Sequence, residues 1–217
     1  MVEVQRFINS RFTSNTYILS HPEYDNVWIV DPGDTENIFE WMENHSKTSV
    51  SGILLTHAHF DHIYGINDVL SRYPDCDVYI ANEYGKDALH NAKTNGSKYT
   101  EEGPVTIVGS AQILFFPKEL TLWNDVFLQT LNTPGHSEDS ICFIVDGNFF
   151  TGDTLIKNIR TVTKLKGGSV VKLDKTIQLI SSLYDKGLYV CAGHDEPFQL
   201  DDYDLTKATS KKYGNKT

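Results

Sequence analysis

The segment at residues 56–62, Thr-His-Ala-His-Phe-Asp-His, constrains this chain more than any other feature. It follows the apolar run at residues 53–55 and holds three of the chain's eight histidines, His57, His59 and His62, together with Asp61. Side chains alternate along an extended segment, so we expect His57 and His59 to point the same way. Imidazole and carboxylate groups are the ligands that a zinc-like cation requires. The segment therefore predicts a metal site at the end of a strand rather than a chance run of surface polar residues.

Length and composition indicate one globular unit. The 217 residues fit a single domain over residues 1–200 with a C-terminal tail at residues 201–217. The hydrophobic content of 40% and the charged content of 22% are ordinary for a globular protein. No apolar run is long enough to span a membrane, and the first residues lack the pattern of a signal peptide. We therefore expect a cytoplasmic protein with no membrane partner.

The charge distribution bears on the partners of the chain. Its net charge of −10 argues against a nucleic-acid partner, because such proteins usually present a basic surface. Residues 154–173 depart from this balance, with five basic residues and no acidic one. This stretch is either a solvated loop or a positive rim beside the site. The three cysteines lack close spacing, and we expect Cys142 and Cys191, which lie in apolar runs, to be small buried side chains.

The apolar periodicity predicts an α/β fold. We expect strands at residues 2–8, 16–20, 27–30, 50–55, 78–81, 105–108, 112–116, 125–131, 141–145, 149–151 and 188–192. Helices are expected at about residues 62–71, 83–92 and 174–184, and another should carry Ile38 and Met42 behind an N-cap at Asp34 or Thr35. The Asp-Gly-Asn sequence at 146–148 indicates a hairpin. Two blocks of strands with interspersed helices favour two sheets packed face to face with helices outside.

Three further ligand candidates follow predicted strands. His136, Asp153 and His194 each come directly after a glycine near the end of an apolar run. Glycine lets the backbone turn sharply there, and residues that act in catalysis are often placed in such loops. The remaining histidines lie in a predicted turn or near predicted helices and are expected at the surface: His21, His45 and His90.

Taken in order, these residues resemble the metallo-β-lactamase-fold hydrolase superfamily. The family signature is His-x-His-x-Asp-His, then Gly-His, Gly-Asp and a final Gly-His, and it matches residues 57–62, 135–136, 152–153 and 193–194. The resemblance implies a four-layer αββα sandwich with the site at one edge, between the two sheets. It also implies two metal ions, two Zn²⁺ in the first instance with Fe or Mn as alternatives. The implied ligands are His57, His59 and His136 for the first ion, Asp61, His62 and His194 for the second, and Asp153 as the bridge.

This arrangement predicts a hydrolase. Two cations that share a water lower its pKa and hold a hydroxide, which is the expected nucleophile. Asp61 would orient the nucleophile or move a proton to the leaving group. Within the superfamily, residues 14–19, 31–33 and 56–62 are similar to small glyoxalase II-like proteins. That resemblance implies hydrolysis of a thioester such as S-lactoylglutathione.

Three departures from the glyoxalase II pattern leave the substrate open. Little chain follows His194, so we expect no C-terminal helical domain of the kind that contacts glutathione in full glyoxalase II. Tyr64 stands where the family often has glycine, and it either donates a hydrogen bond to substrate or fills space. Asp195 follows His194 where many relatives have glycine. The basic stretch with Lys164 and Lys166 would steer a small anionic substrate.

Other classes of protein use similar residues. A persulfide dioxygenase-like oxidoreductase would hold one iron, so metal content separates it from a two-zinc hydrolase. An RNase Z-like nuclease or phosphodiesterase shares the ligands, but the acidic balance disfavours it. A flavodiiron protein would typically carry glutamate at the position of His59. A metal-stabilised binding module would need a closed site of four ligands, and the signature supplies seven.

Overall fold

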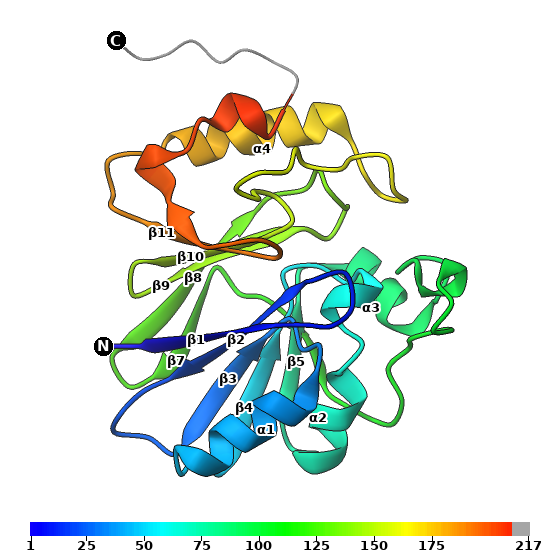
Figure 1. Cartoon of the computed structure of the whole chain (residues 1–217), viewed down its shortest axis with the longest axis vertical. Helices are drawn as coiled ribbons and strands as arrows, with labels where there is room; N and C mark the ends of the chain where they lie inside the picture. Colours follow the sequence, from blue (N-terminus) through cyan, green and yellow to red (C-terminus); the bar gives the residue numbers. More distant parts are fainter. Residues whose placement is uncertain (210–217) are drawn as a thin grey trace.

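The structure, a computed structural model, describes residues 1–209. Two six-stranded sheets pack face to face, with helices on both outer sides (Figure 1). In the first sheet the strands lie side by side in chain order: β1 (Glu3–Ile8), β2 (Asn15–Ser20), β3 (Asn26–Val30), β4 (Ser49–Leu54), β5 (Asp77–Ile80) and β6 (Ile113–Phe115). Strands β3 to β6 are mutually parallel.

The second sheet is formed by the later part of the chain. Its strands are β7 (Glu119–Trp123), β8 (Val126–Asn132), β9 (Ile141–Val145), β10 (Asn148–Gly152), β11 (Tyr189–Ala192) and β12 (Phe198–Gln199), and they also lie in chain order. Strand β9 is antiparallel to both β8 and β10, and β10 is parallel to β11. The carboxyl ends of β8, β10 and β11 therefore meet at one edge of this sheet.

Three hydrophobic layers separate the four structural layers. Helices α1 (Thr35–Asn44), α2 (Ile66–Arg72) and α3 (Glu83–His90) cover the outer face of the first sheet, and α4 (Val170–Ser181) covers the second (Figure 1). The layer between the sheets is filled by side chains such as Trp28, Phe143 and Phe150. The αββα sandwich that the resemblance implied is confirmed.

The central strands are buried on both faces, which is why they appear in the sequence as continuous apolar runs. On β3, Val27 and Ile29 face the helices while Trp28 and Val30 face the second sheet. The predicted hairpin at residues 146–148 joins β9 to β10. Its two loop residues have positive φ, 48° at Asp146 and 80° at Gly147, as the tight turns that suit twisted hairpins require.

Several predicted elements were wrong in position or kind. Residues 105–108 form no strand, because their backbone contacts a loop and a helix instead of a neighbouring strand: the Asn95 side chain donates to the carbonyl of Val105, and the amide of Ile107 donates to that of Leu89. The strands β7 and β12 were not predicted. Helix α2 begins at Ile66, since residues 60–62 form a separate 3₁₀ turn.

One helix start differs from expectation, and another agrees with it except for the capping hydrogen bond. Helix α4 begins at Val170, earlier than predicted, because the Ser169 side chain accepts the amide of Lys172 and caps it. Asp34 does occupy the N-cap of α1, but its carboxylate accepts hydrogen bonds from the side chains of Ser10 and Tyr64 instead of capping the helix.

The burial of side chains confirms the expectations for two cysteines and shows that the expectation for one histidine was wrong. Cys142 and Cys191 are buried, as predicted for small apolar side chains. His21 was expected at the surface and is buried, because it packs against the rings of Tyr24 and Trp123.

Among residues 1–209, no helix is long and apolar enough to cross a bilayer. Of the predicted tail, residues up to 209 pack in part against the α4 layer, and residues 210–217 lie outside the described part of the chain.

Candidate metal centre

Four segments deliver the predicted ligands to one edge of the sandwich. Strand β4 leads from the first sheet into residues 57–62, while β8, β10 and β11 lead from the second sheet to His136, Asp153 and His194. Backbone hydrogen bonds tie the two sheets together at this edge. The amide of Ile141 donates to the carbonyl of Thr56 at 2.9 Å, and the amide of Asn15 donates to that of Gly193 at 2.7 Å. The site is therefore built from both sheets.

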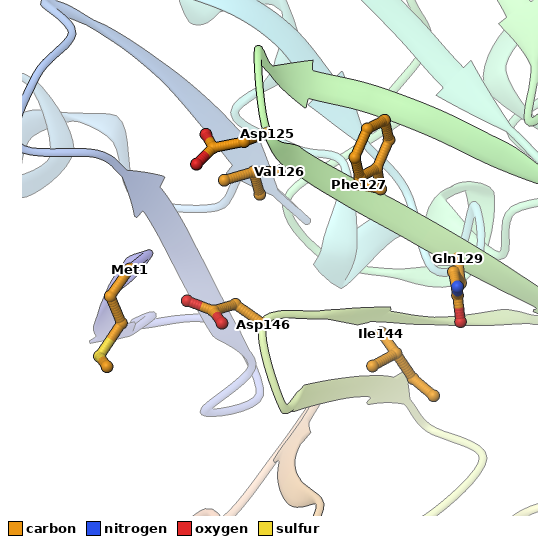
Figure 2. Close-up of a pocket in the computed structure, with 7 residues that line it drawn as sticks. All are labelled: Met1, Asp125, Val126, Phe127, Gln129, Ile144 and Asp146. Atoms are coloured by element: carbon orange, nitrogen blue, oxygen red, sulfur yellow. The ribbon is translucent and has the colours of Figure 1, made fainter.

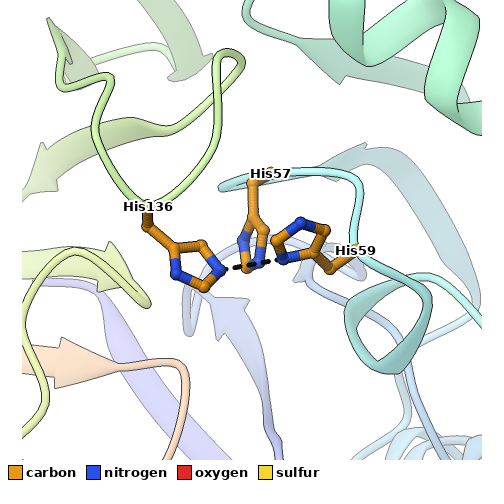
Figure 3. Close-up of side chains that lie close together, drawn as sticks. All are labelled: His57, His59 and His136. Carbon is orange, nitrogen blue, oxygen red and sulfur yellow. Dashed lines mark hydrogen bonds between the residues drawn. The ribbon is translucent and has the colours of Figure 1, made fainter. Parts of the chain in front are cut away.

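The first cluster consists of three buried imidazoles, His57, His59 and His136. One nitrogen of each ring lies within 4.8 Å of the others, and Figure 3 shows these rings turned toward a common point. Nδ1 of His59 and Nε2 of His136 are 2.8 Å apart, so one ring donates a hydrogen bond to the other. That shared proton would have to leave before both nitrogens could bind one cation, since a ligating imidazole nitrogen must be unprotonated.

The second cluster consists of Asp61, His62 and His194, whose ligand atoms also lie within 4.8 Å of one another. Oδ2 of Asp61 is 3.3 Å from Nε2 of His194 and 3.7 Å from Nε2 of His62. Four tetrahedral ligands around a zinc ion lie about 3.3 Å from each other, given metal–ligand distances near 2.0 Å. The spacing in this cluster is therefore that of ligands around an ion rather than that of direct hydrogen bonds.

Asp153 lies between the two clusters. Its Oδ1 is 3.4 Å from Nε2 of His62 and 3.5 Å from Nε2 of His194, while its Oδ2 is 3.5 Å from Nε2 of His136. One carboxylate oxygen thus faces each cluster. The structure brings all seven predicted ligand residues together around two adjacent points.

Unsatisfied polar atoms test whether a cation fits there. Nε2 of His57, Nε2 of His62 and Oδ1 of Asp153 are buried and make no hydrogen bond. A buried polar atom without a partner is costly and calls for an explanation such as a bound ion. One of these atoms belongs to each cluster and the third to the carboxylate between them, so the residues present fit a pair of bound cations.

The surroundings lower the pKa of His57 and His59 in the first cluster and raise the pKa of His62 in the second. Burial and then the neighbouring imidazole of His136 lower the pKa of His59 to about 3, and burial together with three neighbouring imidazoles holds the pKa of His57 well below its usual range. Both rings are therefore neutral, as ligands must be. Burial alone would lower the pKa of His62, but the carboxylates of Asp61 and Asp153 outweigh it and raise that pKa well above its usual value. The second cluster thus concentrates negative charge that a cation would balance.

Contacts outside the two clusters hold the ligands in place, and Asp31 is the residue that the sequence did not single out. Its Oδ1 accepts the amide of Thr56, and its Oδ2 accepts from the Thr56 hydroxyl at 2.6 Å and lies 3.1 Å from Nδ1 of His62. This leaves Nε2 of His62 aimed at Asp153. The sequence signal for Asp31 was its place directly after β3, the neighbour of β4.

Two further contacts orient the ligand loops. Nδ1 of His136 lies 2.8 Å from the carbonyl oxygen of Val162, to which it donates, so Nε2 is left for the cluster. Oδ2 of Asp139 accepts the amide of Ala58, between His57 and His59, at 2.8 Å. Such partners of metal ligands fix ring orientation and tautomer.

The predicted substrate residues have less direct placements. The Tyr64 hydroxyl donates to Oδ1 of Asp34 at 2.6 Å, and the Arg11 guanidinium lies over its ring, 4.5 Å from the centroid. Lys166 donates to the hydroxyl of Thr94 at 2.9 Å. Lys164 is exposed. The proton of Tyr64 is therefore already used within the protein.

A shallow hollow elsewhere on the surface has no connection with the clusters. Figure 2 shows its lining, which comes from Met1 and from β8, β9 and the turns beside them, and includes Phe127 and Ile144. It lies at the start of β8, whereas His136 follows the end of that strand. Its lining includes none of the seven predicted ligands.

The fold and the ordered motif place the chain in a known family: it belongs to the metallo-beta-lactamase superfamily, whose family model matches residues 10–194. Among curated relatives, the chain is 32% identical over 144 residues to hydroxyacylglutathione hydrolase of Pseudoalteromonas translucida, covering 65% of this chain and 47% of the relative. It is 36% identical over 131 residues to the enzyme of the same name from Idiomarina loihiensis, covering 60% and 42%. The match spans about half the length of these relatives.

A solved structure is similar over nearly the whole chain. The BLEG-1 B3 metallo-beta-lactamase has a TM-score of 0.81 and 28% sequence identity, covering 91% of this chain and 94% of that one. The family match and this structural similarity both agree with the sandwich fold.

Proposed function

We propose that this protein is a dinuclear metal-dependent hydrolase that cleaves a thioester or a related small ester. The observation that carries the proposal is the position of Asp153, with one carboxylate oxygen toward each cluster. A single closed structural site would need four ligands and no such bridge. In this proposal His57, His59 and His136 hold one ion, Asp61, His62 and His194 hold the other, and Asp153 bridges them.

The ions would supply the chemical activation: they lower the pKa of a water and polarise the carbonyl that is attacked. The protein's own residues then orient and move protons. The side chains of Asp61 and His194 are each 13% exposed, so the second cluster is in contact with solvent. Asp61 is placed to accept a proton from the attacking water and to return it to the leaving group. Asp31 and the Val162 carbonyl keep His62 and His136 in their ligating orientations.

Zinc is the ion that we propose, because five of the seven ligands are imidazoles, with iron and manganese as alternatives. A thioester is the proposed substrate class, and S-lactoylglutathione is its first test compound, because the curated relatives carry the name hydroxyacylglutathione hydrolase. Because the match covers about half of those relatives, the support for this substrate class comes only from the part of them that the chain matches.

Metal analysis joined to a substrate test decides the proposal. We expect two zinc ions per chain and turnover of S-lactoylglutathione, and Asp153→Ala should lose at least one ion and nearly all turnover. Asp125→Ala, an exposed carboxylate beside the distant hollow, is the matched control. One iron per chain with oxygen uptake would contradict the hydrolase, and full activity of Asp153→Ala would contradict the bridge.

A second candidate activity is β-lactam hydrolysis, which the similarity to the BLEG-1 B3 metallo-beta-lactamase favours. The same zinc-loaded protein should be assayed with a cephalosporin. Faster turnover of the β-lactam than of the thioester would place the chain with that activity.

A further inference from the structure

The segment at residues 157–165, here called the rim segment, follows Asp153 and borders both metal clusters. The side chain of Asn158 donates to Oδ2 of Asp195, the residue after His194, at 2.5 Å. The carbonyl of Val162 accepts from His136 of the first cluster at 2.8 Å. In Figure 1 this yellow part of the chain reaches past the edge of the second sheet on the side where α3 lies. The rim segment is therefore held beside both clusters.

Its side chains combine free positive charge with exposed apolar groups. Lys157, Arg160 and Lys164 are exposed, and within residues 1–209 none of the three has an ion pair or a side-chain hydrogen bond. Between and after them, Ile159 is 49% exposed and Leu165 is 52% exposed. The rest of the chain is strongly acidic, so this concentration of cations is a local feature.

Two acidic residues that lie close in sequence to the predicted ligands His194 and His136 already have partners in the fold. Asp195 accepts from Asn158, and Glu138 is paired with Lys172. Lys166, just beyond the rim segment, is tied to Thr94. Because none of the three exposed cations is engaged in an ion pair within residues 1–209, they can attract an anionic ligand.

We propose that the rim segment binds the carrier part of a coenzyme A thioester. This inference rests on the proposed thioester hydrolysis and names the leaving group of that reaction. Coenzyme A has a diphosphate and a 3′-phosphate, which suit three free cations, and a pantetheine arm with a methyl-bearing apolar part, which suits Ile159 and Leu165. Glutathione has two carboxylates, an ammonium group and no apolar stretch, so it leaves these apolar side chains without a partner.

The reaction is a balanced hydrolysis. Water forms the new C–O bond at the acyl carbon, the C–S bond breaks, and the products are the carboxylic acid and the free thiol of coenzyme A. One proton of the water goes to the sulfur and the other leaves with the acid. No oxidant, reductant or further reactant is required.

Three thioesters with one acyl group isolate the carrier: lactoyl-coenzyme A, lactoyl-pantetheine and S-lactoylglutathione, all assayed with the zinc-loaded protein. We expect the lowest KM for lactoyl-coenzyme A, with an advantage over lactoyl-pantetheine that shrinks in high salt. Reversal of one cation, in Lys157→Glu, Arg160→Glu or Lys164→Glu, should raise the KM for lactoyl-coenzyme A roughly 3- to 10-fold and leave lactoyl-pantetheine unchanged. Adenosine 3′,5′-bisphosphate should compete.

Two further variants sharpen the test. Lys186→Glu makes the same charge change at an exposed lysine before β11, at the opposite end of that strand from His194, and should change neither KM. Leu165→Ser should raise the KM for lactoyl-coenzyme A and lactoyl-pantetheine alike, because both contain the pantetheine arm. Equal effects of the charge reversals on all three thioesters, or no competition by adenosine 3′,5′-bisphosphate, would overturn the coenzyme A assignment.

A binding measurement separates this inference from the proposed function. Desulfo-coenzyme A has no thiol to bind a metal, and its affinity for the protein can be measured by calorimetry without turnover. We expect it to bind wild-type protein and to bind Lys164→Glu several-fold more weakly. If it binds in this way while no thioester is cleaved, the hydrolase proposal fails and the binding site stands. If thioesters are cleaved but it does not bind, the binding site is refuted.

Discussion

Oδ2 of Asp31 lies 3.1 Å from Nδ1 of His62, and both side chains are almost completely buried. This contact fixes which nitrogen of His62 faces the second cluster. Asp31 itself sits in the left-handed backbone region, with φ of 50°, where aspartate and asparagine are tolerated better than most residues. The geometry of the predicted metal centre therefore depends on a residue outside the seven predicted ligands.

Replacement of Asp31 tests this dependence. In Asp31→Asn the backbone conformation is retained, but a neutral amide replaces the carboxylate that holds His62. We expect zinc affinity at the second cluster to fall about 10- to 100-fold, the usual loss when the partner of a ligating histidine is removed. Zinc titration monitored by calorimetry measures it. Asp185→Asn makes the same change at an aspartate that also has positive φ, 63°, but is exposed, and unchanged zinc binding in both variants would contradict the role of Asp31.

The stability of the metal-free protein should depend on pH through His59. Its pKa is about 3 in the folded protein, against 6.5 for an unperturbed histidine, because burial and the His136 ring oppose its charge. Between these values the unfolded chain binds a proton that the folded chain does not. The stability that neutral His59 contributes is thus fully present above pH 6.5 and is lost as the pH falls toward 3.

Urea unfolding of metal-free protein at several pH values measures this effect. The stability of wild type relative to His59→Asn should fall steadily from pH 7 to pH 4, since the variant lacks the imidazole. His90→Asn removes one exposed imidazole from α3 and is the matched control. A stability difference between wild type and His59→Asn that is the same at every pH would show that the pKa of His59 is the same in the folded and the unfolded protein.

Gly65 should tolerate no side chain. A Cβ at this position would lie 2.0 Å from the carbonyl oxygen of Gly33, which is backbone and cannot rotate away. Gly65→Ala should therefore lower the free energy of unfolding by about 1–3 kcal/mol, the usual range for overpacking. Chemical denaturation checks it, with Ser71→Ala on the exposed side of α2 as the control. Wild-type stability of Gly65→Ala would show that the two loops can separate without cost.

Tyr64 offers a test between a substrate contact and a structural one. Its hydroxyl donates to Asp34, and burial followed by this carboxylate raises the pKa of Tyr64 above its usual value. Tyr64→Phe should cost about 1 kcal/mol of stability, the typical contribution of one hydrogen bond. The KM for thioesters should not change. A large rise in KM with unchanged stability would instead assign the hydroxyl to substrate.

The sandwich could be predicted from the family resemblance, and the gathering of seven polar residues at one edge from signals that are local and ordered along the chain. At the Gly-His and Gly-Asp pairs, the glycine indicates a sharp backbone turn at a strand end. At residues 57–62, the alternation of side chains along an extended segment indicates that His57 and His59 point the same way. Asp31 was missed because its partner His62 is 31 residues away, and nothing in the sequence shows that β3 and β4 are neighbours.

The contacts of the lysines in and just beyond the rim segment could not be predicted either. Lys164 and Lys166 have the same sequence signal, yet only Lys166 is tied to another loop, through Thr94. Likewise, His21 has the turn context of a surface residue and is buried, because Trp123 from the second sheet packs against it. Which of two similar side chains is free depends on contacts between segments far apart in the chain.

The two sheets contribute predicted ligands to the same edge from opposite sides of their shared core. A pair of ions bound there would therefore hold the two halves of the polypeptide together. A ligand that binds only the folded form stabilises it by mass action. Removal of zinc by a chelator should then loosen the sandwich first at its catalytic edge, where residues 57–62 meet residues 136, 153 and 194. Zinc supply would in that case set the lifetime of the folded protein as well as its turnover.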